Sequence, residues 1–493
     1  MKIAIPSIKA PSSDIVRAVL KGHSALGLAF AAILYLVCLT GTLAVFVHEF
    51  ERWENPRAPR LEGVEPAAVQ RAYVEAIRRT GRPVEHVIVQ MPDGALPLLR
   101  VTTEQEGGER QSWYATVSGD LAGAAHDGWT QFLTRLHINL HLPRSFGLFV
   151  VGLAGVALLS SLISGLLAHP RIFRDAFHLR LGGSRRLQEA DLHNRIGVWA
   201  FPFHLIVSLT GALLGLSTVI IGALGMAVFQ GDTAKVYALF TPPHPPEDAR
   251  PAPPLDLRPM FETIGRRSGG RVDYIVVEHP TEQGGGAMFS VDDRSQRIAR
   301  LDAYAFDRSA RLYHEQRARE NNVGEAILGS LGQLHFGWFG DAALRIAYGL
   351  LGLALCYLSV GGVQIWLARR RDKGRPAPLF ERLWSAIVWG QPAALALAAA
   401  SALLLADAPT VAVPIWAIAT LASGGLALFR DPLLIQRTAR WVAGATAIAL
   451  SLIHVLMFGA SDRVALAVDM VLLMAGGAVI ATTLANRSKH APV

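Results

Sequence analysis

Long apolar runs alternate with two long polar segments along this chain of 493 residues. Eight of the runs reach about 20 residues, the length that an α-helix needs to cross the hydrocarbon core of a bilayer. The pattern therefore predicts an α-helical integral membrane protein with about eight transmembrane helices. The predicted spans are Ser24–Val47, Phe146–Ala168, Ile196–Phe229, Leu344–Leu367, Leu383–Ala406, Val411–Phe429, Trp441–Phe458 and Val464–Leu484.

The two polar segments, residues 49–136 and 230–334, follow a common order of elements. Each begins with a helical stretch, Pro66–Thr80 in the first segment and Leu257–Ser268 in the second. Each continues with an apolar strand and with further strand-like stretches joined by a turn. We expect two small α+β domains, in each of which a helix precedes a small antiparallel sheet. The first strands are Val84–Val89 and Val272–Val277.

A histidine and a glycine recur at one spacing in the two halves of the chain. His23 precedes Gly41 of a Leu-Thr-Gly motif by 18 residues, and His193 precedes Gly211 of the same motif by 18 residues. A span, a polar domain and a second span thus occur twice in the same orientation, which predicts a duplicated, parallel core. The expected parts are 1–48 (N-terminus and first span), 49–136 (first polar domain), 137–229 (second and third spans with their loop), 230–334 (second polar domain), 335–371 (fourth span) and 372–493 (a four-helix membrane extension without a copy).

Composition and charge agree with this arrangement. Hydrophobic residues make up 51% of the chain and charged residues only 17%, less than in a soluble protein of this length. The net charge of +8 comes largely from Lys and Arg clusters at alternate ends of the spans, such as Arg369–Arg371. Because basic loops stay in the cytoplasm, both termini are expected there and both polar domains outside it. The charge thus reflects topology, and no nucleic-acid partner is expected.

Histidines near the ends of the spans are the candidate ligands of a cofactor, because histidine in a membrane is costly and usually functional. His23 pairs with His193 at the cytoplasmic ends, and His137 pairs with His335 at the outer ends. Neutral imidazole is a good axial ligand of haem iron. We therefore expect two b-type haems, one above the other across the membrane. The two cysteines form no Cys-x-x-Cys motif, so attachment of c-type haem is not supported.

Other histidines leave alternatives open. His141 follows His137 at i+4 on one helical face, which also suits a metal site without haem. His204 is an alternative to His193 as a ligand, or a packing residue. His48, beside two glutamates, is a surface residue or a substrate contact. A role as proton relay is the alternative for the paired histidines themselves.

The histidine motifs carry a resemblance to a known family. Lys-Gly-His23-x-x-x-Gly opens the first span, Asp-Leu-His193-x-x-x-Gly opens the third, and Leu-His335-x-Gly337 comes before the fourth. With these motifs and the two Leu-Thr-Gly repeats, the chain resembles the PepSY-associated transmembrane family of iron-regulated inner-membrane proteins from about Arg17 to Arg371. The two polar domains resemble PepSY domains. The four-helix extension departs from the family pattern.

The resemblance implies a siderophore-linked ferric reductase that carries haem in the bacterial inner membrane. Such a protein would reduce a ferric siderophore or another Fe(III) chelate to Fe(II) on the periplasmic side. No Gly-x-Gly-x-x-Gly motif follows a strand, so an external donor is implied, either a quinol or a cytoplasmic reductase or flavin. Aromatic residues of the outer segments, Trp113, Trp129, Tyr313 and Trp338, are candidate chelate contacts or interface anchors. The alternatives are a siderophore or metal transporter, and a non-enzymatic regulatory membrane protein of the PepSY type.

Overall fold

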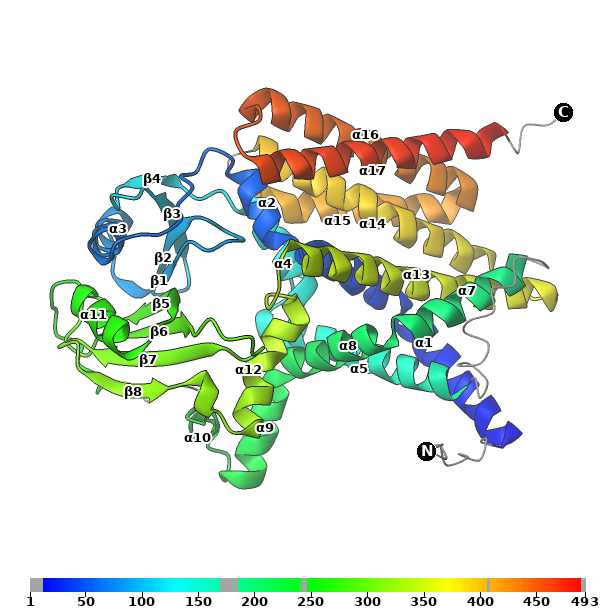
Figure 1. Cartoon of the computed structure of the whole chain (residues 1–493). Helices are drawn as coiled ribbons and strands as arrows, with labels where there is room; N and C mark the ends of the chain where they lie inside the picture. The colour runs from blue at the N-terminus through cyan, green and yellow to red at the C-terminus, as the bar shows by residue number, and fades with distance from the viewer. Residues whose placement is uncertain (1–11, 169–184, 240, 242–245, 406–407, 489–493) are drawn as a thin grey trace, which may run out of the picture.

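The computed structural model describes residues 12–168, 185–239, 241, 246–405 and 408–488 (Figure 1). Within these residues seven helices are long and apolar enough to cross a membrane, and a bent pair, α7 and α8, makes eight if it is counted as one span. The basic loop expected after the second span lies outside the described residues from 169 to 184. The seven helices are α1 (Ser13–Ala44), α5 (Arg144–Leu167), α13 (Ala342–Asp372), α14 (Pro378–Leu404), α15 (Ala408–Phe429), α16 (Pro432–Phe458) and α17 (Arg463–Ser488).

The third predicted span, Ile196–Phe229, is not one helix. It is divided among α7 (Arg185–Trp199), α8 (Phe201–Gly215) and α9 (Ser217–Val228), and the axes of α7 and α8 differ by 71°. Pro202 at the start of α8 explains the first break, because proline has no amide hydrogen for the preceding turn. The prediction of a single continuous span was therefore wrong, and α9 runs across the direction of the long helices (Figure 1).

The polar segments contain the helices and strands that their patterns predict. Pro66–Thr80 is a helix with the expected bounds, and Leu257–Ser268 contains a helix shorter by one residue at each end. The elements of the first segment are α3 (Pro66–Thr80), β1 (Val84–Gln90), β2 (Leu99–Gln105), β3 (Arg110–Ala115) and β4 (Leu121–Ala124). Those of the second are α10 (Thr233–Tyr237), α11 (Arg258–Arg267), β5 (Arg271–Glu278), β6 (Gly286–Asp292), β7 (Leu301–Asp307), β8 (Leu312–Gln316) and the 3₁₀ helix η1 (Ala318–Glu320).

The eight strands form one antiparallel sheet instead of the two small sheets expected. Its order is β4-β3-β2-β1-β5-β6-β7-β8, so the first strand of each segment pairs with the first strand of the other. Each would otherwise be an edge strand with a row of unpaired backbone groups, and their pairing satisfies those groups. In this register Ile88 lies opposite Val276.

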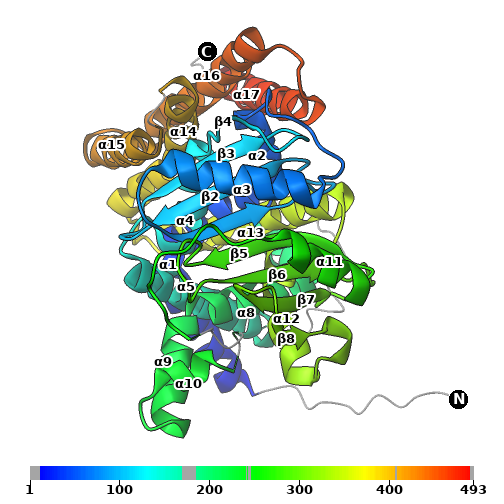
Figure 2. The same cartoon turned by 90° about the vertical axis from the view of Figure 1, so that its left-hand side faces the viewer.

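The sheet has one face toward α3 and α11 and the other toward the ends of the long helices (Figures 1 and 2). Val87 and Val89 of β1 and Ile275 and Val277 of β5 alternate with less buried residues and are fully buried against α3 and α11. We call the end of the helical bundle beside the sheet the sheet end, and the opposite end, where α1 begins, the N-terminal end.

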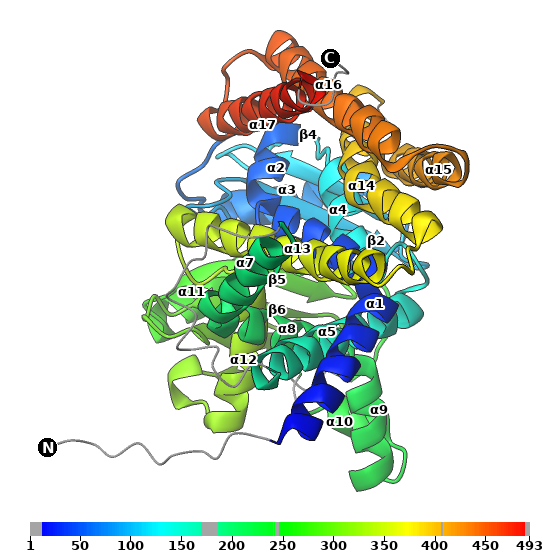
Figure 3. The ribbon, with the colours of Figure 1, turned by 90° about the vertical axis from the view of Figure 1, so that its right-hand side faces the viewer.

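Three short helices connect the sheet with the long helices: α2 (Val47–Glu54), α4 (Gly128–Asn139) and α12 (Val323–Phe336). α12 begins with a capping box between Asn322 and Glu325 and ends at Gly337, whose φ of 72° favours glycine. The four C-terminal helices, α14 to α17, lie on the side of α2 and α4, away from α12 (Figures 1 and 3).

A cross-strand disulfide tests the joint sheet. Cysteines in place of Ile88 and Val276 should form a disulfide on mild oxidation, because directly opposed Cα atoms lie about 4.5–5.5 Å apart. The control pair replaces Ile88 and Met288, which lies one strand further at about 9–10 Å and should not crosslink. Mass spectrometry of unreduced peptides distinguishes the two, and equal crosslinking of both pairs would contradict the register.

Candidate functional site

His137 and His335 lie together at the sheet end of the bundle. His137 comes from α4 and His335 from α12, and their ring centres are 6.1 Å apart with planes inclined by 22°. This separation exceeds the 4.7 Å between the stacked rings of Trp53 and His454 elsewhere in the chain. A metal–imidazole bond is about 2 Å long, so an ion held between two end-on rings needs ring centres about 6 Å apart. The two rings have a separation of that size.

The His137 ring is fixed by α1. Its Nδ1–H donates to the carbonyl oxygen of Val37 at 3.0 Å, and the Thr40 hydroxyl is 3.5 Å from the same nitrogen. A Cβ atom on Gly41 would lie only 2.6 Å from Cε1 of the ring. Gly41 therefore gives the ring its place against the helix.

The His335 ring makes equivalent contacts with α8. The hydroxyl of Thr210 donates to the Ile206 carbonyl and therefore accepts from Nδ1–H of His335, at 3.1 Å. A Cβ atom on Gly211 would lie 2.8 Å from Cε1 of this ring. Because Nδ1 carries the hydrogen in both rings, Nε2 is the unprotonated nitrogen that can bind a metal.

Electrostatics keep both rings neutral. Burial lowers the pKa of His137, and burial together with the neighbouring His137 lowers the pKa of His335 to about 4. A neutral imidazole is the form that binds a metal, so the pair is ready to do so at neutral pH. The hydrogen bonding, the ring separation and the neutral state are compatible with two imidazoles that would hold a haem iron.

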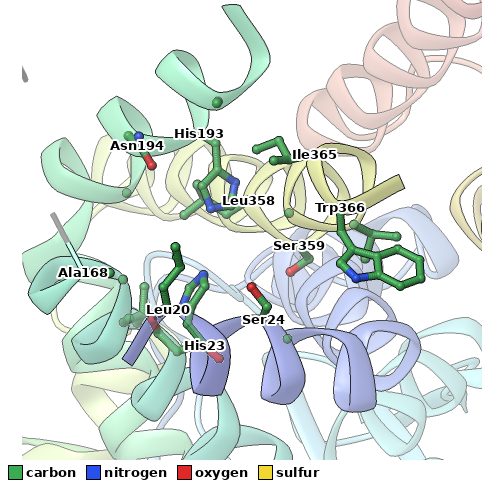
Figure 4. Close-up of a pocket in the computed structure, with 18 of the residues that line it drawn as sticks. Leu20, His23, Ser24, Ala168, His193, Asn194, Leu358, Ser359, Ile365 and Trp366 are labelled. Carbon is green, nitrogen blue, oxygen red and sulfur yellow. Dashed lines mark hydrogen bonds between the residues drawn. The ribbon is translucent and has the colours of Figure 1, made fainter. Parts of the chain in front are cut away.

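His23 and His193 face a second site at the N-terminal end. Both line a cavity of about 510 Å³ bordered mainly by α1, α5, α7 and α13. Figure 4 shows the two rings turned into this cavity from opposite sides, with Leu20, Ser24 and Trp366 around them. The volume lies within the range of about 300–1,000 Å³ that is usual for small-molecule and cofactor sites.

Each ring of the second pair again lies against glycine. Nδ1–H of His23 donates to the Ser161 carbonyl of α5 at 3.0 Å, and a Cβ atom on Gly165 would be 3.3 Å from Cε1 of His23. His193 lies against Gly361 and Gly362 of α13, where added Cβ atoms would be 3.4 and 3.5 Å from its ring. These contacts are looser than those of the first pair.

The two pairs lie near opposite ends of one helix. α1 is continuous from His23 to Gly41, and 18 residues of α-helix rise by about 27 Å. That rise is close to the thickness of about 30 Å of a hydrocarbon core. The chain thus has one histidine pair near each end of its long helices.

The other histidines have different surroundings. α4 ends at Asn139 and His141 has a φ of 53°, so the interpretation of His137 and His141 as an i, i+4 pair on one helical face was wrong. The ring of His141 stacks on Phe132, with Nε2–H donating to the Phe132 carbonyl at 2.9 Å. Among the described residues, no group of three or more His, Cys, Asp or Glu is arranged to hold a metal ion.

His204 and His48 are also placed by direct contacts. His204 is fully buried between α8 and α13, and its Nε2–H donates to the Leu351 carbonyl of α13 at 3.1 Å. The His48 ring stacks on Trp338 with centres 5.7 Å apart.

Ring contacts lead from the first pair to Trp338, which is among the candidate contacts proposed from the sequence, through Phe336, which the sequence analysis did not single out. The ring of His335 contacts Phe336 at 5.4 Å, and Phe336 contacts Trp338 at 4.5 Å. Trp338 is 42% exposed. Gly337 lets the chain turn between Phe336 and Trp338, because its φ is positive and a Cβ atom there would lie only 3.2 Å from the Tyr348 ring. The signal in the sequence is the aromatic run that begins at His335, which the motif analysis used only for its histidine.

Comparisons with known proteins cover the region of both histidine pairs. A family model described as PepSY-associated TM region matches residues 20–369. An uncharacterized protein of Pseudomonas aeruginosa is 29% identical in an alignment of 373 residues that covers 70% of this chain and 93% of that protein. The family match ends before α14, so the four C-terminal helices lie outside it.

Alanine substitutions of glycine test the close ring contacts. G41A and G211A should destabilise the protein by about 1–3 kcal/mol, because the added methyl group would overlap the neighbouring imidazole. The matched controls G27A and G197A add a methyl group in the same two stretches of the repeat, where nothing lies within 4 Å. The midpoint of thermal unfolding in detergent measures the effect. Equal midpoints for G41A and G27A would contradict the packing of His137 against α1.

Proposed function

The chain belongs to the family of PepSY-associated TM regions, and from that premise we propose that it is a haem-containing oxidoreductase of the bacterial inner membrane. It carries electrons across the bilayer and reduces chelated Fe(III) to Fe(II) on the side of the sheet. The observation that carries the proposal is the pair His137 and His335, whose ring centres are 6.1 Å apart, with each ring fixed against the Thr-Gly motif of a different helix, α1 or α8.

The same contacts support an internal duplication of the core. His137 lies against Thr40 and Gly41, and His335 lies against the corresponding Thr210 and Gly211. The segments between the spans contribute four strands each and meet at β1 and β5. We infer that these segments are two PepSY domains whose sheets have joined.

Four histidines would hold the cofactor. His137 and His335 would bind one b-type haem, and His23 and His193 the other. A bound haem supplies a one-electron carrier whose potential depends on its axial ligands and their hydrogen bonds. The chain fixes the tautomers: Nδ1–H of His23 and of His137 each donates to a backbone carbonyl, which orients the ring and raises the basicity of Nε2.

The ends of the bundle would have different partners. At the N-terminal end, the cavity beside His23 and His193 lies on the side where a quinol or a cytoplasmic reductase or flavin would donate electrons, given the basic loops expected there. At the sheet end, Trp338 is exposed. Its ring contacts that of Phe336, which in turn contacts the ring of His335. A ferric siderophore or other Fe(III) chelate is the substrate, and its iron accepts one electron.

The difference spectrum of the purified protein, reduced with dithionite minus oxidised, tests the proposal. We expect a b-type band and reduction of an Fe(III) chelate by proteoliposomes, detected with an Fe(II) indicator. Absence of the band after expression with added haem would overturn the oxidoreductase and leave the transporter or the regulatory protein.

Single substitutions assign the ligands. H137A and H335A should each remove the same haem, and H23A and H193A the other, because each haem would be held by both imidazoles of its pair. Haem content per chain and the spectrum after removal of free haem measure the loss. H314A changes a histidine on β8, away from both pairs in sequence and fold, and should keep both haems. Loss of haem in H141A or H204A instead would transfer the ligand role to those residues.

Trp338 tests the path to the outside. W338L should leave the haem spectrum unchanged and raise the KM for an aryl Fe(III) chelate by about two- to tenfold, because an aromatic contact contributes about 0.5–1.5 kcal/mol. W338F retains a ring and should lie nearer the wild type. An unchanged KM in W338L would show that Trp338 is not a substrate contact.

A further inference from the structure

One contact between the four C-terminal helices and the rest of the chain consists of three buried polar side chains that hydrogen-bond with one another. Trp53 of α2, His454 of α16 and Asp469 of α17 are each about 1% exposed. The indole Nε1–H of Trp53 donates to Oδ1 of Asp469 at 2.8 Å. Nδ1 of His454 is 2.8 Å from Oδ2 of Asp469, and Nε2 is 2.8 Å from the Trp53 carbonyl oxygen. We call these three residues the latch.

Each polar side-chain group of the latch has a hydrogen-bond partner. Both ring nitrogens of His454 face oxygen acceptors, so Asp469 and His454 hold two hydrogens between them. The ring of His454 also stacks on that of Trp53, with centres 4.7 Å apart. Removing one member would leave a buried polar or charged group without its partner, which is strongly destabilising.

A second set of contacts lies beside the latch. Asp462, just before α17, binds Arg52 at 2.7 Å and Arg60 at 2.9 Å. Burial alone would raise the pKa of Asp462, but hydrogen bonding to Arg52 and the two arginine charges hold it below its ordinary value. Asp462 also accepts amide hydrogens from the first turn of α17. The end of α17 nearest the sheet is therefore tied to α2 and to the chain that follows it.

The residues after Trp53 extend this connection to α4. The carboxylate of Glu54 accepts the amide hydrogens of Trp129 at 2.6 Å and Thr130 at 3.0 Å, together with the Thr130 hydroxyl. Asn55 both donates to and accepts from the backbone of His126. α2 thus holds the first turn of α4.

The other face of α4 packs directly on the extension. Phe132, Leu133 and Leu136 are buried in one cluster with Ala398 of α14 and Ala412 of α15. The next residue after Leu136 is His137. The helix that presents His137 is therefore fixed at its start through the latch and along its length by α14 and α15.

α12 provides an internal comparison. It presents His335 to the same site, yet every residue of α12 keeps part of its surface exposed, and Val323 and Ile327 are 78% and 57% exposed. The extension lies on the side of α4, away from α12 (Figure 1). The two histidines of one pair are thus held very differently.

From these contacts we propose that α14 to α17 form a brace that positions His137, with Trp53, His454 and Asp469 as its positioning residues. The role of His137 as a ligand rests on the proposed function. The chain of contacts from α17 through α2 to α4 does not depend on it. The brace lies outside the residues that match the family. It gives the four unmatched helices a role in setting the geometry of the site at the sheet end.

Hydrogen exchange of the full-length protein, without added haem, tests the connection. D469A should raise amide exchange in peptides of α4 by about tenfold or more, and leave peptides of α12 unchanged. W53F removes the indole N–H donor but keeps an aromatic ring that can stack on His454. It should therefore raise exchange in α4 less than D469A does. It is the variant to use if D469A does not fold.

R440A is the matched control. Arg440 is also buried between α16 and α17, where it binds the Thr482 hydroxyl, but it lies 14 residues or about 21 Å before His454 along α16. R440A should loosen the extension without changing exchange in α4. The proposal is overturned if exchange in α4 is unchanged in both D469A and W53F, if R440A raises it equally, or if α4 and α12 change together.

A spectroscopic readout separates this proposal from the proposed function. In haem-loaded protein, W53F should shift the midpoint potential of the haem lost in H137A and leave that of the other haem unchanged. Equal shifts of both potentials would overturn the brace. If the wild type binds no haem while exchange in α4 rises in D469A, the oxidoreductase fails and the mechanical connection stands.

Discussion

The close contact between an imidazole ring and a glycine on a neighbouring helix is the constraint on which the arrangement of the bundle depends. Any side chain at Gly41 or Gly211 would occupy the space of the ring. With the ring in place, its Nδ1–H reaches a carbonyl or hydroxyl oxygen of the same helix. Each contact thus fixes the distance between two helices and the protonation of one imidazole together. Glycine, threonine and histidine of the repeat are parts of one interaction.

The sheet imposes a second condition on the pair at the sheet end. α4 follows β4 and α12 follows β8, which are the two opposite edges of the sheet. Eight strands at about 4.8 Å spacing place those edges about 34 Å apart. The two short helices must therefore converge beneath the sheet to bring their rings to 6.1 Å. The pairing of β1 with β5 determines where both helices begin, so it contributes to the site although it lies outside it.

Local patterns predicted much of the fold, and contacts between distant segments account for what they could not predict. Apolar runs and helix signals located the spans and α3, because both depend on nearby residues. The joining of the two sheets was not predictable, since the edge of β1 carries no signal for which strand will cover it. The break at Pro202 was a local signal that the length of the apolar run obscured. The sequence repeat pointed to His137 and His335 as a pair, but the end of α4 at Asn139 depends on packing and left His141 misassigned.

The apolar side chains of α4 and α12, the helices that present His137 and His335, are covered to different extents. Apolar side chains on α4 and on α12 both need to be covered, because exposed apolar surface is unfavourable in water. The extension covers α4 with apolar contacts from α14 and α15. Directed hydrogen bonds connect α17 to α2, and others connect α2 to α4. Ile327 and Leu328 of α12 are 57% and 47% exposed, and a bilayer surface could offer their exposed parts only non-directional contact. His137 and His335 are therefore held with unequal rigidity, because directional bonds restrict a helix in ways that apolar cover does not.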